Sequence, residues 1–289
     1  MAAALVLVAS ACSASALPKL AGDPNPSISS TPTVDSVATP PEAAPETDKF
    51  VGNFTPEVLA TFPHDPAAFT QGLEWHNDQL LESTGRDSSL RLVEPTTGEP
   101  TWRADIGDEL FAEGVTVVAG EAVQLTYKDE TLLTTDLDDL VSGLPVEQSI
   151  QREPKAYQGE GWGLCFDGSR LAMTNGSSTV TFRDPETFDE ISTLDVTLDG
   201  VPVEDLNELE CVNGQIWANV WKTNTILAID PETGKVDAQV DASKLVPDGV
   251  DTDVNAVLNG IAWNPETGNF WLTGKLWPVM YEVRFVPVS

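Results

Sequence analysis

Basic residues are scarce in this chain of 289 residues. It contains 15 lysines and arginines against 46 aspartates and glutamates, which gives a formal net charge of −31 at pH 7. Proteins that bind nucleic acid neutralise its phosphates with lysine and arginine, so this balance argues against a nucleic-acid partner. The excess of acid is typical of an acid-rich, solvated surface.

Histidine and cysteine are rare as well. The two histidines, His64 and His76, lack a metal-ligand spacing, which argues against a zinc-dependent enzyme. Two of the three cysteines, Cys165 and Cys211, lie in the part of the chain that is expected to fold. They could form a disulfide in an oxidising compartment or be ordinary buried strand residues, and the sequence leaves both readings open.

The chain also lacks an apolar run long enough to span a bilayer. Residues 3–17 are small and apolar, and they resemble the hydrophobic part of an export signal within 1–17. A loose lipobox ends at Cys12, where cleavage would leave a lipidated cysteine and a possible membrane tether; the alternative is secretory cleavage nearer Leu17. Residues 18–48 have almost no large apolar side chain, which predicts a disordered linker. We therefore expect an exported protein, extracellular or a cell-surface lipoprotein, with one folded domain over 49–289.

Internal repeats are the main signal in this folded part. Five segments share one plan: a short apolar strand, a turn rich in Asn, Asp and Gly, and a second strand. They begin at Gly72, Gly114, Gly163, Glu208 and Gly260. Each segment predicts a β-hairpin, and the spacings of 42, 49, 45 and 52 residues suit four-stranded propeller blades. The sequence therefore predicts an all-β, five-bladed β-propeller.

Residues at equivalent positions of propeller blades converge on the central channel. Directly before the repeats stand an acid, three amides and an indole: Gln71, Glu113, Trp162, Asn207 and Asn259. The second strands end near Thr84, Tyr127, Asn175, Trp221 and Lys275. Aromatic walls around amides, one Glu and one Lys predict a small-molecule site at one mouth of the channel.

Eight motifs, in fixed order, carry a resemblance to a known family. They are FPHDPAAFTQGL, FAEGVT, LTYKDE, EGWGLCFDG, LNELE, ANVW, LNGIAW and TGKLWP, from about Phe62 to Phe285. In these motifs the chain resembles the plant-type and bacterial glutaminyl cyclases, a family of glutaminyl-peptide cyclotransferases. The resemblance implies a five-bladed propeller that converts an N-terminal glutamine of a peptide or protein to pyroglutamate, releasing ammonia, without a cofactor. A single closed propeller gives no reason to expect more than a monomer.

The resemblance also implies roles for individual residues. Glu113 matches the catalytic glutamate, which would move a proton from the attacking amine to the leaving one; the alternative is a Glu satisfied by structural hydrogen bonds. Lys275 would lie near this carboxylate or near the oxyanion of the intermediate, unless it forms a structural ion pair. Gln71 and Asn207 would hold the γ-amide of the substrate, or else would fasten neighbouring blades.

The aromatic side chains match the family's pocket. Phe111, Tyr127, Trp162 and Trp221 would shape it and exclude water, together with Phe69. The family usually has Trp at position 127, so Tyr127 puts substrate preference in question. We interpret Glu160 and Glu208 as secondary residues beside the ring, and Trp75, Trp102, Trp217, Trp263 and Trp271 as core.

Two other functions remain as alternatives. One is a non-catalytic cell-surface propeller whose channel mouth binds a ligand or partner. The other is a propeller lactonase or quinoprotein-like enzyme, which Asn207 and Asn259 suggest only faintly. The sequence also leaves open a structural cation in the channel.

Overall fold

The structure is a computed structural model that describes residues 49–137, 150–154, 157–250 and 253–288. These residues belong to the compact unit that spans Glu46–Ser289. The expected export segment (1–17) and linker (18–48) lie outside the described residues. Within the described ranges, no helix has the length and apolar character needed to cross a membrane.

Three sheets contain four antiparallel strands each, hydrogen-bonded in chain order. The first consists of β2 (Thr70–His76), β3 (Gln79–Thr84), β4 (Ser89–Val93) and β5 (Pro100–Asp105). The second consists of β6 (Ala112–Val118), β7 (Glu121–Thr126), β8 (Thr131–Asp136) and β9 (Ile150–Pro154). The third consists of β10 (Leu164–Phe166), β11 (Leu171–Met173), β12 (Thr179–Arg183) and β13 (Glu190–Asp195).

An eight-stranded sheet joins the two ends of the folded part. Its order is β16 (Leu206–Val212), β17 (Gln215–Val220), β18 (Thr225–Ile229), β19 (Val236–Asp241), β1 (Gly52–Pro63), β22 (Val279–Pro287), β21 (Asn269–Gly274) and β20 (Leu258–Asn264). The first strand, β1, pairs in parallel with β19 and antiparallel with the last strand, β22. A two-stranded sheet, β14 (Thr197–Leu198) with β15 (Val201–Pro202), and the short 3-10 helix η1 (Ser243–Leu245) complete the elements.

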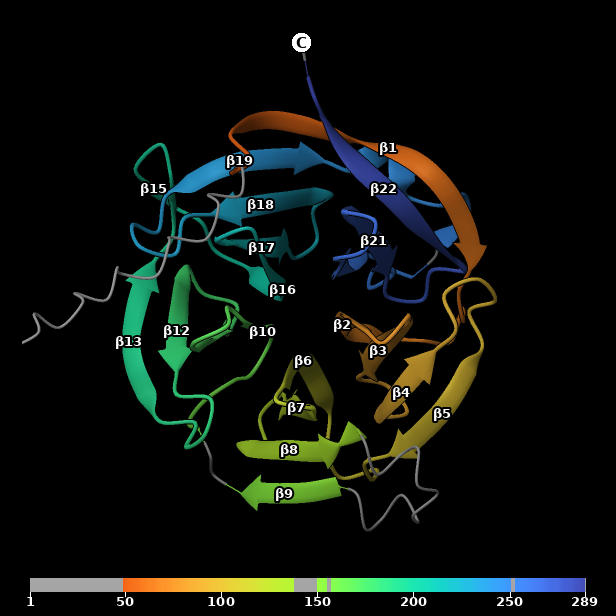
Figure 1. The fold of residues 1–289 in the computed structure, drawn as a ribbon, viewed down its shortest axis with the longest axis vertical. Coiled ribbons are helices and arrows are strands. Elements are labelled where there is room, and N and C mark those ends of the chain that lie inside the picture. Colours follow the sequence, from red (N-terminus) through yellow and green to blue (C-terminus); the bar gives the residue numbers. More distant parts are fainter. Residues whose placement is uncertain (1–48, 138–149, 155–156, 251–252, 289) are drawn as a thin grey trace, which may run out of the picture. The chain divides into compact units, whose positions relative to one another are not determined.

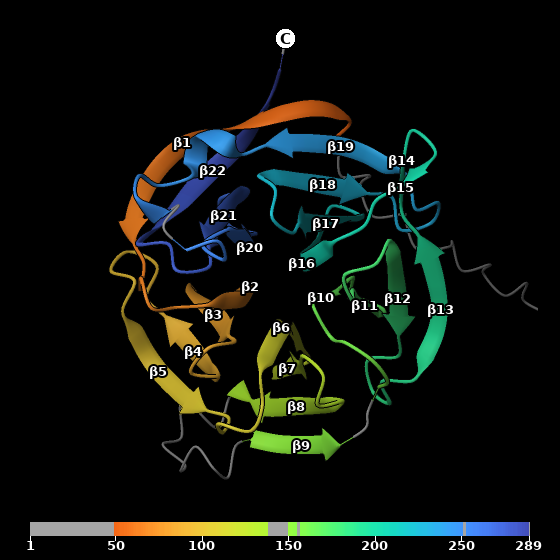
Figure 2. The ribbon, with the colours of Figure 1, turned by 180° about the vertical axis from the view of Figure 1, so that it is seen from behind.

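The sheets surround a central axis, and their first strands lie nearest to it (Figures 1 and 2). These inner strands are buried over most of their length, as in β16, whereas the outer strand β13 is almost entirely exposed. An inner strand has a neighbouring sheet on each side, so both of its faces are covered. The all-β architecture predicted from the repeats is confirmed.

The turns of the inner hairpins have the geometry that the sequence predicts. Asn213 and Gly214 join β16 to β17 with φ angles of 55° and 68°, and Asn77 and Asp78 join β2 to β3 with 47° and 63°. Two consecutive residues with positive φ are typical of the type I′ turn, whose twist matches that of the paired strands. The Asn- and Asp-rich turns therefore set the register of the inner hairpins.

Gly114 shows why a glycine follows the channel-facing residue in several repeats. A Cβ atom at this position would lie 2.6 Å from the backbone N of Leu164 and 2.6 Å from the carbonyl O of Trp162. Without a side chain, the Gly114 N–H donates a 2.7 Å hydrogen bond to that same carbonyl of Trp162. The glycine lets the inner strands of two sheets meet backbone to backbone at the channel.

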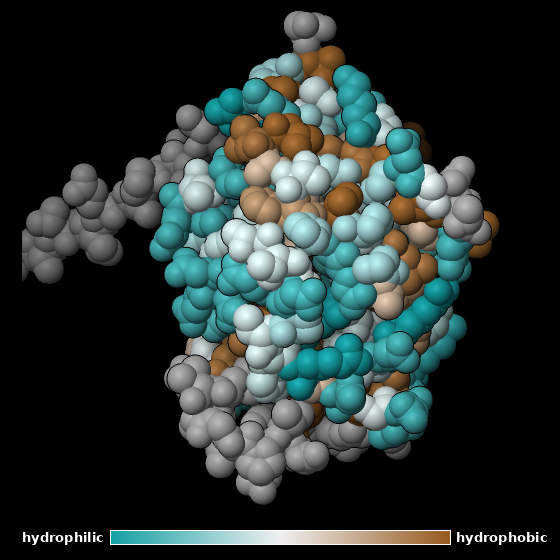
Figure 3. Space-filling model, turned by 90° about the vertical axis from the view of Figure 1, so that its right-hand side faces the viewer, coloured by the Kyte–Doolittle hydropathy of each residue, from teal (hydrophilic) through white to brown (hydrophobic). Residues whose placement is uncertain are grey.

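The core lies between the sheets. Trp217 is fully buried and packs against Phe270 and Phe285, whose rings stack at 4.4 Å. The other four tryptophans expected in the core are buried or partly buried in the same kind of cluster: Trp75, Trp102, Trp263 and Trp271. On the surface, hydrophilic residues cover most of the side shown in Figure 3, as the acid-rich composition predicts.

Candidate active site

A cavity of about 300 Å³ lies at the end of the ring where the inner strands begin. It is lined by Phe69, Gln71, Phe111, Glu113, Tyr127, Trp162, Asn207, Trp221, Asn255 and Lys275. All nine residues that the sequence analysis assigned to the site are among them. The structure thus brings together side chains that lie on or next to four of the sheets.

Irregular strand pairing points three of these side chains into the cavity. The register shifts between Thr70 and Gly72 in β2, between Ala112 and Val115 in β6, and between Leu206 and Leu209 in β16. These interruptions contain Gln71, Glu113 and Asn207. A β-bulge bends its strand and changes the direction of a side chain, so the interrupted ladders position the polar floor of the cavity.

Glu113 is the buried acid of the cavity, with only 4% of the residue exposed. Its Oε1 accepts a 3.0 Å hydrogen bond from Nε2 of Gln71. Burial raises the pKa of Glu113 well above its ordinary value, the charge of Lys275 opposes this rise, and Glu160 adds to it. Its carboxyl group therefore holds a proton at a higher pH than an exposed glutamate does, as a general acid/base requires.

Lys275 follows β21 and is as deeply buried as Glu113. Burial lowers the pKa of Lys275 to about 8, while the carboxyl groups of Glu113 and Glu208 act in the opposite direction. Its Nζ lies 5.0 Å from the centre of the Phe69 ring. The cavity thus holds a cation that titrates close to neutral pH.

Two amide oxygens in the cavity have no hydrogen-bond partner within the described residues. They are Oε1 of Gln71 and Oδ1 of Asn207, and both side chains are buried. A buried carbonyl oxygen without a partner is unfavourable unless a ligand or water supplies a donor. Asn259, the third amide that the sequence placed in this ring, does not line the cavity, because its Nδ2 donates to the carbonyl of Thr70 at 2.9 Å.

Aromatic rings form the wall of the cavity. Phe111 contacts Phe69 and Tyr127, with ring centres 6.2 and 6.0 Å apart. On the other side, Trp162 and Trp221 meet edge to face at 5.4 Å. All of these rings except Phe69 are partly exposed, so the wall opens to solvent at its rim.

A buried ionic network links β3, through Glu82, to β2, the strand that carries Gln71. Nδ1 of His64 donates to the carbonyl of Trp277 at 2.8 Å, and its Nε2 faces Oε1 of Glu82 at 3.1 Å. Both ring nitrogens thus face acceptors, which requires the imidazolium form. Burial lowers the pKa of His64, but the neighbouring Glu82 has the larger combined effect, so the pKa of His64 is raised. Burial raises the pKa of Glu82, but His64 and Arg91 outweigh it and lower that pKa to about 2. Since Thr70 also donates to Glu82 at 2.7 Å, the network fixes backbone next to the site.

The two acids that the sequence analysis interpreted as secondary have structural contacts. Glu160 accepts from Nε1 of Trp162 at 3.0 Å and pairs with Lys128 at 2.9 Å, so it orients the aromatic wall. Glu208 does not line the cavity, because its two oxygens accept backbone N–H groups of Leu73 and Ile261. It joins the inner strands of separate sheets.

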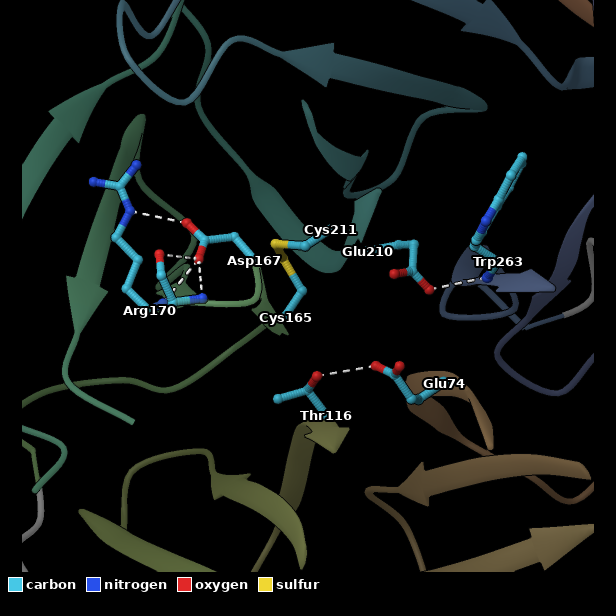
Figure 4. Close-up of a disulfide and its surroundings, with 9 residues drawn as sticks. Glu74, Thr116, Cys165, Asp167, Arg170, Glu210, Cys211 and Trp263 are labelled. Atoms are coloured by element: carbon cyan, nitrogen blue, oxygen red, sulfur yellow. Dashed lines mark hydrogen bonds and ion pairs between the residues drawn. A yellow bond between two sulfur atoms is a disulfide. The ribbon is translucent and has the colours of Figure 1, made fainter. Parts of the chain in front are cut away.

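Farther along the inner strands, the two cysteines whose pairing the sequence left open form a disulfide. Cys165 of β10 and Cys211 of β16 join neighbouring sheets (Figure 4). In the same view Glu210 accepts from the backbone N of Trp263 at 2.9 Å, and Glu74 accepts from Oγ1 of Thr116 at 3.0 Å. This end of the ring is therefore occupied by links between sheets.

Asn255 is the cavity residue that sequence reasoning missed. It lies in the loop before β20, and its backbone N and Nδ2 both donate to Oδ1 of Asp253, at 2.9 and 3.1 Å. It precedes the fifth repeated segment, which begins at Gly260, so the comparison of repeats could not find it. The only local signal is the Asp-x-Asn spacing, which is typical of an Asx turn.

Two larger hollows lie elsewhere on the described part of the chain. One of about 380 Å³ includes Cys211 and Gly214, and one of about 540 Å³ includes Glu121 and Phe188. Neither contains an acid or base with the strong burial of Glu113. The described residues contain no group of three or more His, Cys, Asp or Glu side chains that could hold a metal ion.

Comparisons with known proteins identify the family to which the chain is similar. A family model described as glutamine cyclotransferase matches residues 31–285. A glutaminyl-peptide cyclotransferase of Arabidopsis thaliana is 37% identical over 243 residues, which cover 81% of this chain and 72% of that protein. The crystal structure of Myxococcus xanthus glutaminyl cyclase matches with a TM-score of 0.74 and 37% identity, over 83% of this chain and 100% of that one.

Proposed function

Because the chain belongs to the glutamine cyclotransferase family, we propose that it converts an N-terminal glutamine to pyroglutamate with release of ammonia. The substrate is a peptide or protein with a free N-terminal glutamine, and the reaction is an intramolecular acyl transfer. The single observation that carries the proposal is a buried carboxyl group with a raised pKa, Glu113, inside a small aromatic cavity.

The reaction needs one group that both accepts and donates a proton. The substrate's α-amine attacks the γ-carbonyl carbon, forming the ring C–N bond and a tetrahedral intermediate. The C–N bond to the γ-nitrogen then breaks, and that nitrogen leaves as ammonia only after gaining a proton. Glu113 takes the proton from the attacking amine and passes it to the departing nitrogen, so the enzyme ends in its starting state.

The remaining polar groups orient the glutamine side chain. The unpartnered oxygens of Gln71 and Asn207 accept N–H donors of the substrate, from its amide or its amine. The ammonium of Lys275 stabilises the negative charge that develops on the carbonyl oxygen. The aromatic wall excludes water, which strengthens both interactions in the closed cavity.

The proposal extends to the architecture of the fold and to the location of the protein outside the cytoplasm. We interpret the eight-stranded sheet as two blades, β16–β19 and β20–β22 with β1, which together with the three four-stranded sheets make a five-bladed propeller. The disulfide suits an oxidising compartment, and it supports export with 1–17 as the signal segment and 18–48 as a linker. A lipidated Cys12 and a monomeric state are part of the same proposal.

Ammonia release from a Gln-initiated dipeptide tests this function. We expect the protein to release ammonia with and without a metal chelator, and Glu113→Gln to lower kcat by about 10²- to 10⁴-fold because the proton transfer is lost. The control is Glu121→Gln, an exposed acid in the neighbouring strand of the same sheet. Absence of release from every Gln-initiated peptide would contradict the proposal and favour a non-catalytic binding module.

A further inference from the structure

Three exposed basic side chains lie at the rim of the cavity, although the chain has only 15 lysines and arginines. Each stacks on an aromatic ring that lines the cavity: Arg86 on Phe69 at 4.3 Å, Lys128 on Tyr127 at 4.5 Å and Lys222 on Trp221 at 4.0 Å. They occupy the same place in three repeats, just after the second strand of the inner hairpin. A cation over an aromatic face is held there by the ring's quadrupole, so the charges stay at the rim.

Carboxylates balance two of these three cations. Arg86 pairs with Asp253 at 3.3 Å, and Lys128 pairs with Glu160 at 2.9 Å. Among the described residues, no carboxylate lies within ion-pair distance of Lys222. The backbone of Lys222 has a φ angle of 60°, in the tight turn that directly follows Trp221. Lys222 is therefore the rim cation with an uncompensated charge.

The chemistry of the cavity determines which part of a substrate reaches this rim. In the proposed reaction the side chain and the α-amine of the first residue both react, so both must lie beside Glu113. The peptide continues from the carbonyl group of that residue and leaves through the open mouth of the cavity. We expect the second residue of the peptide to lie at the rim of the cavity, next to the aromatic wall. Lys222 lies at this rim, over the ring of Trp221.

We propose that Lys222, held on Trp221, forms a subsite for a carboxylate next to the N-terminal glutamine of the substrate. This inference rests on the proposed function and names its substrate class: peptides with an acidic second residue. The charge of −31 on the chain repels acidic peptides at long range. A local cation at the mouth offsets this repulsion where the peptide leaves the cavity.

Peptide kinetics test the subsite. The substrates are the C-terminally amidated peptides Gln-Glu-Ala, Gln-Gln-Ala and Gln-Lys-Ala, which differ only in the second side chain. For the wild type we expect kcat/KM to be about threefold to fivefold higher for Gln-Glu-Ala than for Gln-Gln-Ala, the effect of one exposed ion pair. In Lys222→Gln this ratio should fall to about 1, and Lys222→Arg should restore it. A 1 M salt buffer should remove the preference in the wild type, because it screens exposed charges.

The matched control is Lys235→Gln, which removes the same charge from an exposed lysine in the turn between β18 and β19. That turn lies at the opposite end of the ring from the cavity, because β18 runs away from the turn that holds Lys222. Gln-Ala with a free C-terminus, compared with its amide, shows whether a C-terminal carboxylate serves as well as an acidic side chain. Equal ratios in the wild type and Lys222→Gln, or no preference for Gln-Glu-Ala in the wild type, would overturn the subsite.

Binding separates this inference from the proposed function. Calorimetric titration of Glu113→Gln and of Glu113→Gln/Lys222→Gln with the amidated peptides measures the dissociation constants without turnover. Tighter binding of Gln-Glu-Ala that depends on Lys222 would support the subsite even if no ammonia is released. Equal or undetectable binding of the three peptides would overturn it, whatever the activity.

Discussion

At the scale of single residues, Glu113 and Lys275 change each other's protonation. Burial pushes both groups toward their neutral forms, and each opposes this effect in the other through its charge. The position of both residues could be predicted from the repeats and the family motifs. Their pKa shifts could not, because desolvation depends on the side chains that other sheets place around them.

The pH dependence of activity should show the titration of Lys275. Its pKa of about 8 means that the cation is lost as pH rises through this value. We expect kcat/KM to fall above pH 8, after a rise caused by deprotonation of the substrate amine near pH 7.7 and by ionisation of Glu113, whose pKa burial raises. In Lys275→Arg the guanidinium stays charged, so the fall should disappear and only the rise remain. An unchanged fall in this variant would show that another group causes it.

At the scale of elements, different kinds of link join the inner strands of neighbouring sheets. Near the cavity the links are hydrogen bonds such as Gly114 N–H to the carbonyl of Trp162. At the other end, the disulfide between Cys165 and Cys211 joins β10 to β16. The acids Glu74 and Glu210 add hydrogen bonds there, and burial raises the pKa of both.

Removing the disulfide should destabilise the fold while leaving the cavity residues in place. The two cysteines are 46 residues apart in sequence, and cross-linking a loop of this length restricts the unfolded chain by about 4 kcal/mol. We expect Cys165→Ala/Cys211→Ala to lower the free energy of unfolding by about 2–4 kcal/mol in urea titrations. Reduction of the wild type should give the same loss. If the double variant and the oxidised wild type are equally stable, the link contributes nothing.

At the scale of the whole molecule, pairing between distant segments closes the ring. The first strand, β1, lies between β19 and the last strand, β22 (Figure 1). Phe54 pairs with Val240 of β19 and Pro287 of β22, and its side chain packs in the largest core cluster. Closure therefore depends on contacts between the two ends of the folded part.

Truncating Phe54 should weaken this closure. The side chain is buried, so Phe54→Ala removes apolar contacts and leaves a cavity. We expect a loss of about 3–5 kcal/mol in the free energy of unfolding, measured by urea titration. Val51→Ala is the control, because Val51 is 72% exposed, and it should change stability by less than about 0.5 kcal/mol. A similar effect of both substitutions would contradict a closing role for Phe54.

Local sequence patterns were sufficient to predict the class of fold and most of the residues that line the cavity. Short apolar strands, turns rich in Asn, Asp and Gly, and a regular spacing of repeats are signals within the sequence. They were enough to predict inner hairpins around a channel. Equivalent positions in the repeats then identified Gln71, Glu113, Trp162 and Asn207, because repetition brings equivalent residues to the same place. The ends of the second strands also identified Tyr127, Trp221 and Lys275, and the family resemblance added Phe69 and Phe111.

Features that depend on contacts between sheets became known only from the folded structure. It placed Asn255 in the cavity and moved Asn259 and Glu208 out of it, because these three make hydrogen bonds that repeat equivalence does not describe. It also paired Cys165 with Cys211. Pairing, burial and charge compensation are set by neighbours far away in sequence, so no local pattern of residues could determine them.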